Sequence, residues 1–443
     1  MARKNKKRRS YPPPAVPLPN KNKKEKGPAA KPPAGQPTRE TIESLVIAFV
    51  LAFLFRTFQA EAFVIPTGSM APTLMGQHKD VYCTESGERF KIDASKESPE
   101  TYPTSEIRKE FGQYAGRTRD PRLARDFGVL ADQPAPVLRA QVETVAGVSP
   151  SCRYTLPVQD RLNPSAVPPG ATQTRQATFS GDRILVNKYL YSFVDPSRWD
   201  VVVFKYPGNA VKNYIKRLVG LPNEDLRIVG GDVFTRPAGS NEPYEIARKP
   251  PSKILAMRQL VHDTDHDAAA LYRAGWPLRW GNAAESPGWS PEVDIDGKRA
   301  VQVYKADAAS DMAWLRYRHT TADFGQWGEA LGDKAASEKP LAGAAEPRLI
   351  TDFNAYNTEV LRKALTLNPY APSIQVPEDS QGLHWVGDLM VEADIVIESS
   401  DGELVFELVE AGRRHRCAID LATGTAALSL IPAGQNEPSP GFA

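Results

Sequence analysis

The chain combines one long apolar run with a series of short apolar stretches. The long run occupies residues 42–58 and has its polar residues near its two ends. Its length and composition predict a transmembrane helix at residues 41–58, with a buried core helix as the competing interpretation. The short stretches are rich in β-branched residues and bounded by turn residues, and they predict strands at 81–83, 183–188, 200–205, 214–219 and 226–229.

Three longer regions separate or follow these stretches. Residues 84–178 are polar, contain several prolines and show weak periodicity, so we expect an insertion with little regular structure. Residues 237–380 form a second insertion, rich in tryptophan. Residues 381–443 alternate apolar and polar positions at 384–395 and 404–409, which predicts an incomplete β-sandwich-like segment.

The fold class predicted from these patterns is mainly β. Residues 59–83 and 179–236 contain the predicted short strands, which favour an antiparallel, β-barrel-like core. Long insertions interrupt this core, and a partial β-sandwich follows it near the C-terminus.

The distribution of charge predicts the membrane topology of the chain. The 443 residues carry a net charge of +2, yet Lys and Arg crowd residues 1–40, which we interpret as a disordered basic tail. The positive-inside rule places this tail in the cytoplasm and the residues after the apolar run outside. A cleaved signal peptide is the alternative, but no small-x-small site follows the run. The rest of the chain has no basic stripe with interleaved aromatic residues, so we expect membrane lipid and no nucleic acid as a partner.

Three cysteines are too few for a disulfide-dense scaffold. Residues 83–87 and 149–153 resemble two C-x-x-C turns of a zinc ribbon, each with one cysteine replaced by serine. A structural zinc site needs four N or S ligands, so we expect no metal here. Two alternatives remain open for Cys83 and Cys152, namely two unrelated free thiols or a disulfide formed in an oxidising compartment.

Ser69 is the candidate nucleophile because a short apolar strand delivers it into a turn bounded by glycine and proline. A serine nucleophile needs a base, and none of the six histidines lies in the segments predicted to surround Ser69. His262 and His266 have the i, i+4 spacing of a metal-binding helix face, but the aspartates between and after them favour a solvated acidic loop.

Lys216 is the alternative base. It lies within an apolar predicted strand, and a lysine can accept a proton where desolvation favours the neutral amine. The competing interpretation is an ordinary edge-strand lysine that points to solvent.

Three blocks in order, residues 63–74, 181–188 and 214–222, resemble the type I signal peptidases, membrane-anchored Ser/Lys endopeptidases that remove signal peptides from exported preproteins. The resemblance implies that Ser69 is the nucleophile, Lys216 the general base and Thr67 a hydroxyl donor to the oxyanion hole. It assigns Asp182 and Arg217 to the scaffold and implies no cofactor and no metal. It also implies pockets for small substrate side chains, lined by Phe63, Ile65, Leu74, Tyr214 and Ile215.

The sequence also departs from the family pattern. Asn223 replaces a glycine that is usual after Leu-Pro, and the final family block, Gly-Asp-Asn-Ser, is missing, because Gly387 and Asp388 are followed by Leu-Met. We therefore expect a C-terminally truncated member of the family. We predict a single-pass protein of the bacterial inner membrane with an extracytoplasmic catalytic domain. The alternatives are a catalytically inactive membrane-tethered binding protein and a soluble Ser/Lys self-cleaving repressor, which requires an N-terminal DNA-binding domain.

Overall fold

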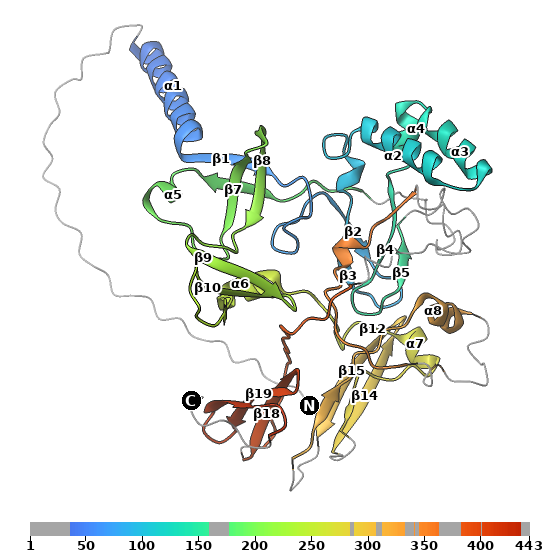
Figure 1. The fold of residues 1–443 in the computed structure, drawn as a ribbon. Coiled ribbons are helices and arrows are strands. Elements are labelled where there is room, and N and C mark those ends of the chain that lie inside the picture. Colours follow the sequence, from blue (N-terminus) through green and yellow to red (C-terminus); the bar gives the residue numbers. More distant parts are fainter. Residues whose placement is uncertain are drawn as a thin grey trace, which may run out of the picture. The chain divides into compact units, whose positions relative to one another are not determined.

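The computed structural model describes residues 36–158, 177–283, 288–306, 312–332, 341, 345–362, 382–399 and 401–435 (Figure 1). The chain divides into two compact units, Met1–Ala60 and Glu61–Ala443.

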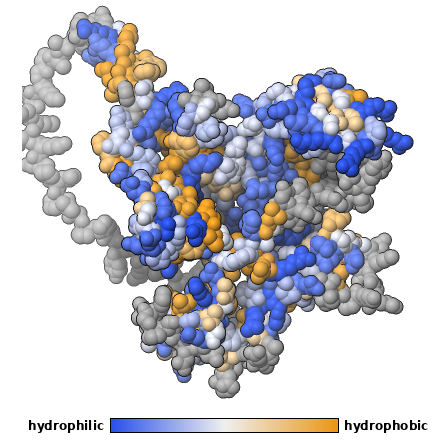
Figure 2. Space-filling view, viewed as in Figure 1, coloured by the Kyte–Doolittle hydropathy of each residue, from blue (hydrophilic) through white to orange (hydrophobic). Residues whose placement is uncertain are grey.

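The first unit contains the helix α1 (Gln36–Leu54) and a π-helical turn, η1 (Phe55–Gln59). Arg39 and Glu43 form an i, i+4 ion pair on α1 at 2.7 Å. Of the predicted disordered tail, residues 1–35 lie outside the described residues, and the prediction is wrong for residues 36–40, which begin α1. Figure 2 shows apolar side chains on the surface of this helix, and the exposed ones are Ile42, Leu45, Val46, Ile47, Phe49, Val50, Leu51, Phe53 and Leu54.

Of the helices in the described part of the chain, none combines the length and the apolar character needed to cross a membrane. The transmembrane helix predicted at residues 41–58 is therefore not confirmed.

The second unit is mainly β, as predicted. Its described strands form eight separate sheets of two or three strands each, so the closed antiparallel core that we expected is not confirmed. The five strands predicted at 81–83, 183–188, 200–205, 214–219 and 226–229 are all present. They are β2 (His78–Tyr82), β6 (Arg183–Asn187), β7 (Val201–Tyr206), β8 (Asn209–Arg217) and β9 (Glu224–Val229). The core segments also contain β1 (Ala60–Val64) before the Ser69 turn, the short helix α5 (Leu190–Phe193) after β6, and β10 (Asp232–Pro237), which was not predicted.

These strands pair locally except for one long-range pair. β1 pairs with β6, which brings together parts of the chain on either side of the first insertion. β7 and β8 form an antiparallel hairpin in which Val202 faces Lys216. β9 and β10 form a second hairpin, extended by β11 (Glu245–Ile246).

The first insertion has regular structure in residues 84–158, so the prediction of little regular structure is wrong there; residues 159–176 lie outside the described residues. It contains β3 (Arg89–Asp93), η2 (Ser95–Glu97), α2 (Thr104–Arg117), α3 (Pro121–Ala131), α4 (Ala135–Ala140), β4 (Thr144–Val148) and β5 (Thr155–Pro157). The helices form because apolar residues recur at helical spacing: Ile107 and Phe111 on α2 pack with Phe127 on α3 in one buried cluster. Asp120 caps α3 by accepting a hydrogen bond from the N–H of Arg122 at 2.8 Å.

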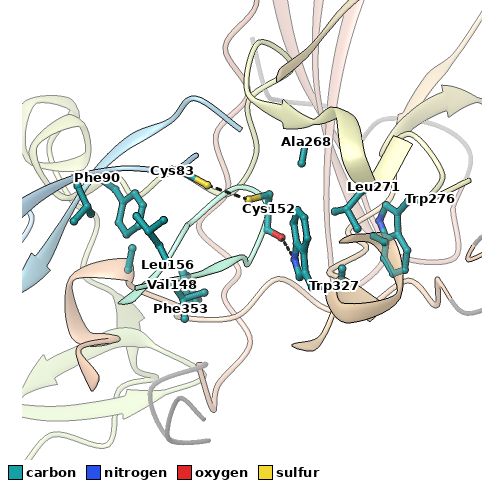
Figure 3. Packing of buried hydrophobic residues seen from close by; sticks show 14 of the residues in the cluster. Cys83, Phe90, Val148, Cys152, Leu156, Ala268, Leu271, Trp276, Trp327 and Phe353 are labelled. Carbon is teal, nitrogen blue, oxygen red and sulfur yellow. Dashed lines mark hydrogen bonds between the residues drawn. The ribbon is translucent and has the colours of Figure 1, made fainter. Parts of the chain in front are cut away.

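The second insertion packs against the first. Its elements are α6 (Pro251–Met257), β12 (Asp267–Ala268), α7 (Ala269–Arg273), β13 (Trp280–Asn282), β14 (Trp289–Asp296), β15 (Arg299–Ala306), β16 (Leu315–Tyr317), α8 (Phe324–Leu331), η6 (Ala355–Asn357) and β17 (Val360–Leu361). Cys83, Phe90 and Leu156 share a buried cluster with Trp276 and Trp327 (Figure 3). β17 also pairs with β4, so the two insertions build a common core.

The C-terminal segment is a three-stranded antiparallel sheet of β18 (Glu403–Glu410), β19 (Arg413–Asp420) and β20 (Ala426–Ile431). The strand predicted at 404–409 is confirmed. The strand predicted at 384–395 is wrong, because that segment forms only a single bridge, between Thr351 and Trp385. Ion pairs hold it instead: Asp388 contacts Lys249 and Glu392 contacts Arg258.

Candidate active site

The end of β1 fixes where the Ser69 turn begins. Ile65 is only 2% exposed, and its N–H donates to the carbonyl oxygen of Asp182 at 2.9 Å. Gly181 passes so close to this strand that a Cβ atom there would lie 1.9 Å from the carbonyl oxygen of Ile65. Only glycine therefore allows the segment before β6 to approach β1 this closely.

The far end of the turn is held by Asp182. Its carboxylate accepts a hydrogen bond from the N–H of Met75 at 2.7 Å, and its own N–H donates to the carbonyl of Met75 at 2.9 Å. Between these ends, the N–H of Ala71 donates to the carbonyl of Gly68 at 2.9 Å. Met70 is buried while Ser69 is exposed, so the turn presents the serine hydroxyl to solvent.

The side chain of Lys216 reaches this hydroxyl from β8. Its Nζ lies 2.8 Å from Oγ of Ser69 and donates a second hydrogen bond to the carbonyl of Ile215 at 3.0 Å. A neutral amine at this distance can accept the serine proton as the oxygen attacks a carbonyl carbon. The two residues that the sequence singled out are thus in direct contact, and both are exposed.

Arg217, next to Lys216, ties β8 to the turn. Its Nη2 donates to the hydroxyl of Thr73 at 2.8 Å, and its Nη1 donates to the carbonyl of Trp199 at 3.0 Å. The Thr73 hydroxyl in turn donates to the carbonyl of Ala256 at 2.8 Å, on α6 of the second insertion. Burial lowers the pKa of Arg217. The contacts of Arg217 connect three segments around the Ser69 and Lys216 pair.

The residues expected to line substrate pockets differ in exposure. Tyr214 is 37% exposed and stacks on Phe204 with ring centroids 6.2 Å apart. Phe63, Leu74 and Ile215 are half-buried, whereas Ile65 is buried in the interior. Thr67 is exposed, two residues before Ser69.

Tyr356, from η6, packs against the turn at Gly68, a contact that was not predicted from the sequence. Its hydroxyl donates to the carbonyl of Gln77 at 3.0 Å and lies 3.3 Å from a carboxylate oxygen of Asp93. A Cβ atom on Gly68 would lie 1.9 Å from Cε1 of the Tyr356 ring. Burial raises the pKa of Tyr356, so the phenol stays protonated and remains a donor. No local pattern links residues this far apart in the chain.

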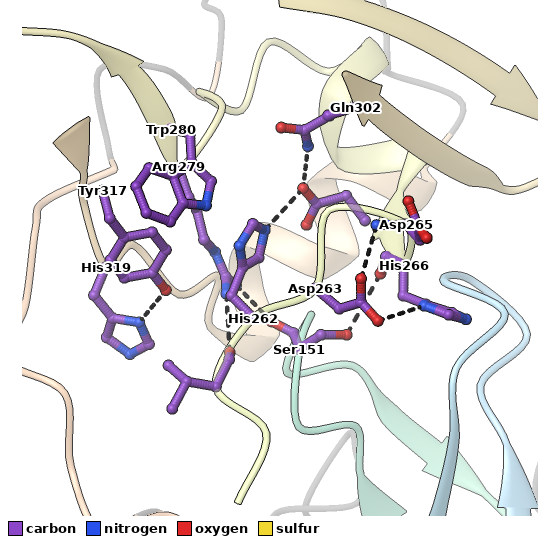
Figure 4. Close-up of polar contacts among 12 residues, drawn as sticks. Ser151, His262, Asp263, Asp265, His266, Arg279, Trp280, Gln302, Tyr317 and His319 are labelled. Carbon is purple, nitrogen blue, oxygen red and sulfur yellow. Dashed lines mark hydrogen bonds and ion pairs between the residues drawn. The ribbon is translucent and has the colours of Figure 1, made fainter. Parts of the chain in front are cut away.

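The histidine pair that resembled a metal site does not act as a unit. His262 contacts Asp267 at 3.1 Å and His266 contacts Asp263 at 3.0 Å (Figure 4). The side chain of His262 is only 4% exposed, so the solvated-loop interpretation is wrong for that residue. Among the residues described, no group of three or more His, Cys, Asp or Glu side chains could hold a metal ion.

The family-model match concerns the segment that carries Lys216. A family model for signal peptidase, peptidase S26, matches residues 167–270; Ser69 lies before this segment. Signal peptidase I of Pseudomonas aeruginosa is 38% identical over 78 residues, which cover 15% of this chain and 27% of the relative. Signal peptidase I of Pseudomonas fluorescens is 46% identical over 59 residues, covering 11% and 21%. That of Aquifex aeolicus is 54% identical over 39 residues, covering 9% and 15%.

The matches span less than a third of the length of each of these three relatives. No solved structure matches the chain. The matched segment nevertheless contains both the β1 partner strand β6 and the lysine that contacts Ser69. This segment of the chain is thus similar to the signal peptidases of the peptidase S26 family.

Proposed function

We propose that this protein is a serine endopeptidase that removes signal peptides from exported preproteins. Ser69 is the nucleophile and Lys216 is the general base. The observation that carries the proposal is the 2.8 Å contact between Nζ of Lys216 and Oγ of Ser69.

In the proposed reaction, the neutral amine of Lys216 takes the proton of the Ser69 hydroxyl while Oγ attacks the scissile carbonyl carbon. The N–H of Ser69 and the hydroxyl of Thr67 donate to the oxyanion that develops. The ammonium of Lys216 then returns the proton to the leaving amine, and the peptide bond breaks. Water, deprotonated by the same amine, hydrolyses the acyl-enzyme and frees Ser69.

The proposed substrate binds in an extended conformation beside β1. Among the described strands, β1 pairs only with β6, so its other edge is available to a peptide strand. The half-buried side chains of Phe63, Leu74 and Ile215 flank the route to Ser69. Shallow apolar pockets of this kind favour small side chains such as alanine at the cleavage site.

The proposal includes a location at a membrane. Its support is the exposed apolar surface of α1 and the basic residues that precede this helix in the sequence. We expect the full chain to remain in the membrane fraction after alkaline carbonate extraction and a variant lacking residues 1–60 to be released. Release of the full chain would contradict the location without affecting the chemistry.

Cleavage of a purified preprotein with an Ala-x-Ala site tests the activity. We expect the new N-terminus, identified by mass spectrometry, to follow the second alanine. Replacement of that alanine by phenylalanine in the preprotein should abolish cleavage, because the pocket is small. Equal cleavage by the Ser69→Ala variant would refute the proposed nucleophile. Folded wild-type protein that binds the preprotein without cutting it would favour the inactive binding protein.

A further inference from the structure

Two tight turns, residues 83–88 and 149–154, have the same backbone hydrogen bonds. In the first turn, the N–H of Cys83 donates to the carbonyl of Glu88 at 2.8 Å, and the N–H of Gly87 donates to the carbonyl of Cys83 at 2.9 Å. In the second turn, the N–H of Ser149 donates to the carbonyl of Tyr154 at 3.0 Å, and the N–H of Arg153 donates to the carbonyl of Ser149 at 3.1 Å. The two turns are therefore local copies of one another.

Their backbone angles agree as well. Gly87 and Arg153 occupy the fifth position of each turn, and both have a positive φ, 72° and 59°. Arginine adopts this left-handed conformation rarely, so the surrounding structure must stabilise it. The guanidinium of Arg153 lies 3.2 Å from the ring centre of Phe353, which anchors the second turn in the core.

The two turns bring two sulfur atoms close together. Cys83 holds the first position of one turn, and Cys152 holds the fourth position of the other. Their Sγ atoms lie 3.8 Å apart, and the two residues are 0% and 1% exposed (Figure 3). Both sulfur atoms are therefore shielded from solvent in the folded chain.

Ser86 and Ser149 hold the two remaining positions and do not complete a metal site. Ser149 donates a hydrogen bond to the buried carboxylate of Glu88 at 2.8 Å, and Ser151 donates to the same oxygen at 2.6 Å. Two thiols beside hydroxyl groups lack the four N or S ligands that structural zinc needs. The two turns therefore hold a pair of neighbouring thiols and no metal site.

We propose that Cys83 and Cys152 form a disulfide that joins the two turns. To form the bond, the sulfurs need to approach from 3.8 Å to about 2.05 Å. The bond would close a loop around the helices α2, α3 and α4, and it would lie where Trp327 donates to the carbonyl of Cys152 at 3.0 Å.

The reaction is a thiol–disulfide exchange with a low-molecular-weight or protein disulfide as oxidant. The thiolate of one of the two cysteines attacks one donor sulfur, the donor S–S bond breaks, and a donor thiolate leaves. The other cysteine loses its proton and attacks the sulfur of the first, which releases the second donor thiolate. The two cysteines together lose two protons and two electrons, and the donor disulfide is reduced to two thiols.

The folded chain distinguishes the two sulfurs by their pKa. The hydrogen bond with Cys152 lowers the pKa of Cys83 to about 6. Burial raises the pKa of Cys152. Because both sulfurs are buried in the folded chain, exchange takes place before the two turns close on each other during folding. That the native compartment is oxidising rests on the proposed function.

Non-reducing peptide mapping tests the proposal. The full chain is produced behind a secretory signal, so that an oxidising compartment is reached whatever the native location, and free thiols are trapped with N-ethylmaleimide in acid and denaturant. We expect the peptides of Cys83 and Cys152 to be linked and Cys417 to be alkylated. Alkylation of both Cys83 and Cys152 would overturn the proposal, as would one zinc ion per chain in elemental analysis.

Variants separate the disulfide from a structural role of the thiols. Reductant should lower the melting temperature of the wild-type chain and of Cys417→Ser by on the order of 5 °C. It should not change that of Cys83→Ser, where no bond can form. An unaltered melting temperature in the wild type would contradict a stabilising disulfide. A linked chain that fails to cut preproteins would refute the proposed function alone.

Discussion

The turn that presents Ser69 depends on the absence of a side chain at Gly68. A Cβ atom there would lie 1.9, 2.6 and 2.8 Å from three atoms of the Tyr356 ring. All three distances are below any that real Cβ atoms adopt, so in a Gly68→Ala variant the ring or the turn must move.

The cost of Gly68→Ala follows from what must move. Overpacking of a filled site costs about 1–3 kcal/mol. Displacing Tyr356 also weakens its hydrogen bonds to Gln77 and Asp93, each worth about 0.5–1.5 kcal/mol. We therefore expect a loss of about 2–4 kcal/mol in the free energy of unfolding, measured by urea titration. If the turn moves instead, Ser69 shifts by about 1 Å, and kcat/KM for preprotein cleavage should fall by about 100-fold.

A double-mutant cycle tests the reasoning. With Tyr356→Ala the ring is gone, so adding Gly68→Ala should change stability by less than about 0.5 kcal/mol. Gly112→Ala on α2 is the control, because a Cβ atom there meets nothing within 4 Å, and the helix should gain up to about 1 kcal/mol. Equal costs of Gly68→Ala with and without the Tyr356 ring would refute the account.

Two further predictions concern buried ionisable side chains. Burial lowers the pKa of His319 to about 3, below the ordinary value of about 6.5, so the unfolded chain binds the extra proton and stability should fall as pH decreases from about 6.5 to about 3. Across this pH range, the midpoint of urea unfolding should fall less steeply in His319→Gln than in the wild type. Identical slopes would contradict the assignment of this pH dependence to His319. Lys79→Met leaves Glu97 buried without the amine at 3.1 Å and should cost about 3–5 kcal/mol. Lys305→Met, in an exposed pair, should leave the free energy of unfolding almost unchanged, and a loss equal to that of Lys79→Met would exclude the effect of burial.

The sequence predicted the parts of this protein whose signals are local. β-branched runs bounded by turns located β6, β7, β8 and β9, because period and composition determine a strand without reference to its partner. The contact between Ser69 and Lys216 was predicted through the order of three family blocks and not through any local property. The matching turns at Cys83 and Cys152 were visible as a repeated spacing, but the distance between their sulfurs was not.

The wrong predictions concern segments whose conformation depends on tertiary contacts. The helices α2 and α3 were missed because charged residues mask the spacing of Ile107, Phe111 and Phe127. Residues 384–395 alternate like a strand, yet ion pairs to Lys249 and Arg258 hold them in another conformation. Tyr356 could not be found, because its role arises only when the second insertion folds against the turn of Ser69.

The central claim is that the amine of Lys216 activates Ser69. The most direct test is kcat/KM for cleavage of an Ala-x-Ala preprotein by Lys216→Ala, with Lys205→Ala on the same hairpin as the matched control. The account predicts a loss of about 100- to 10,000-fold for Lys216→Ala and a rate near that of the wild type for Lys205→Ala. Cleavage by Lys216→Ala at the wild-type rate would contradict it.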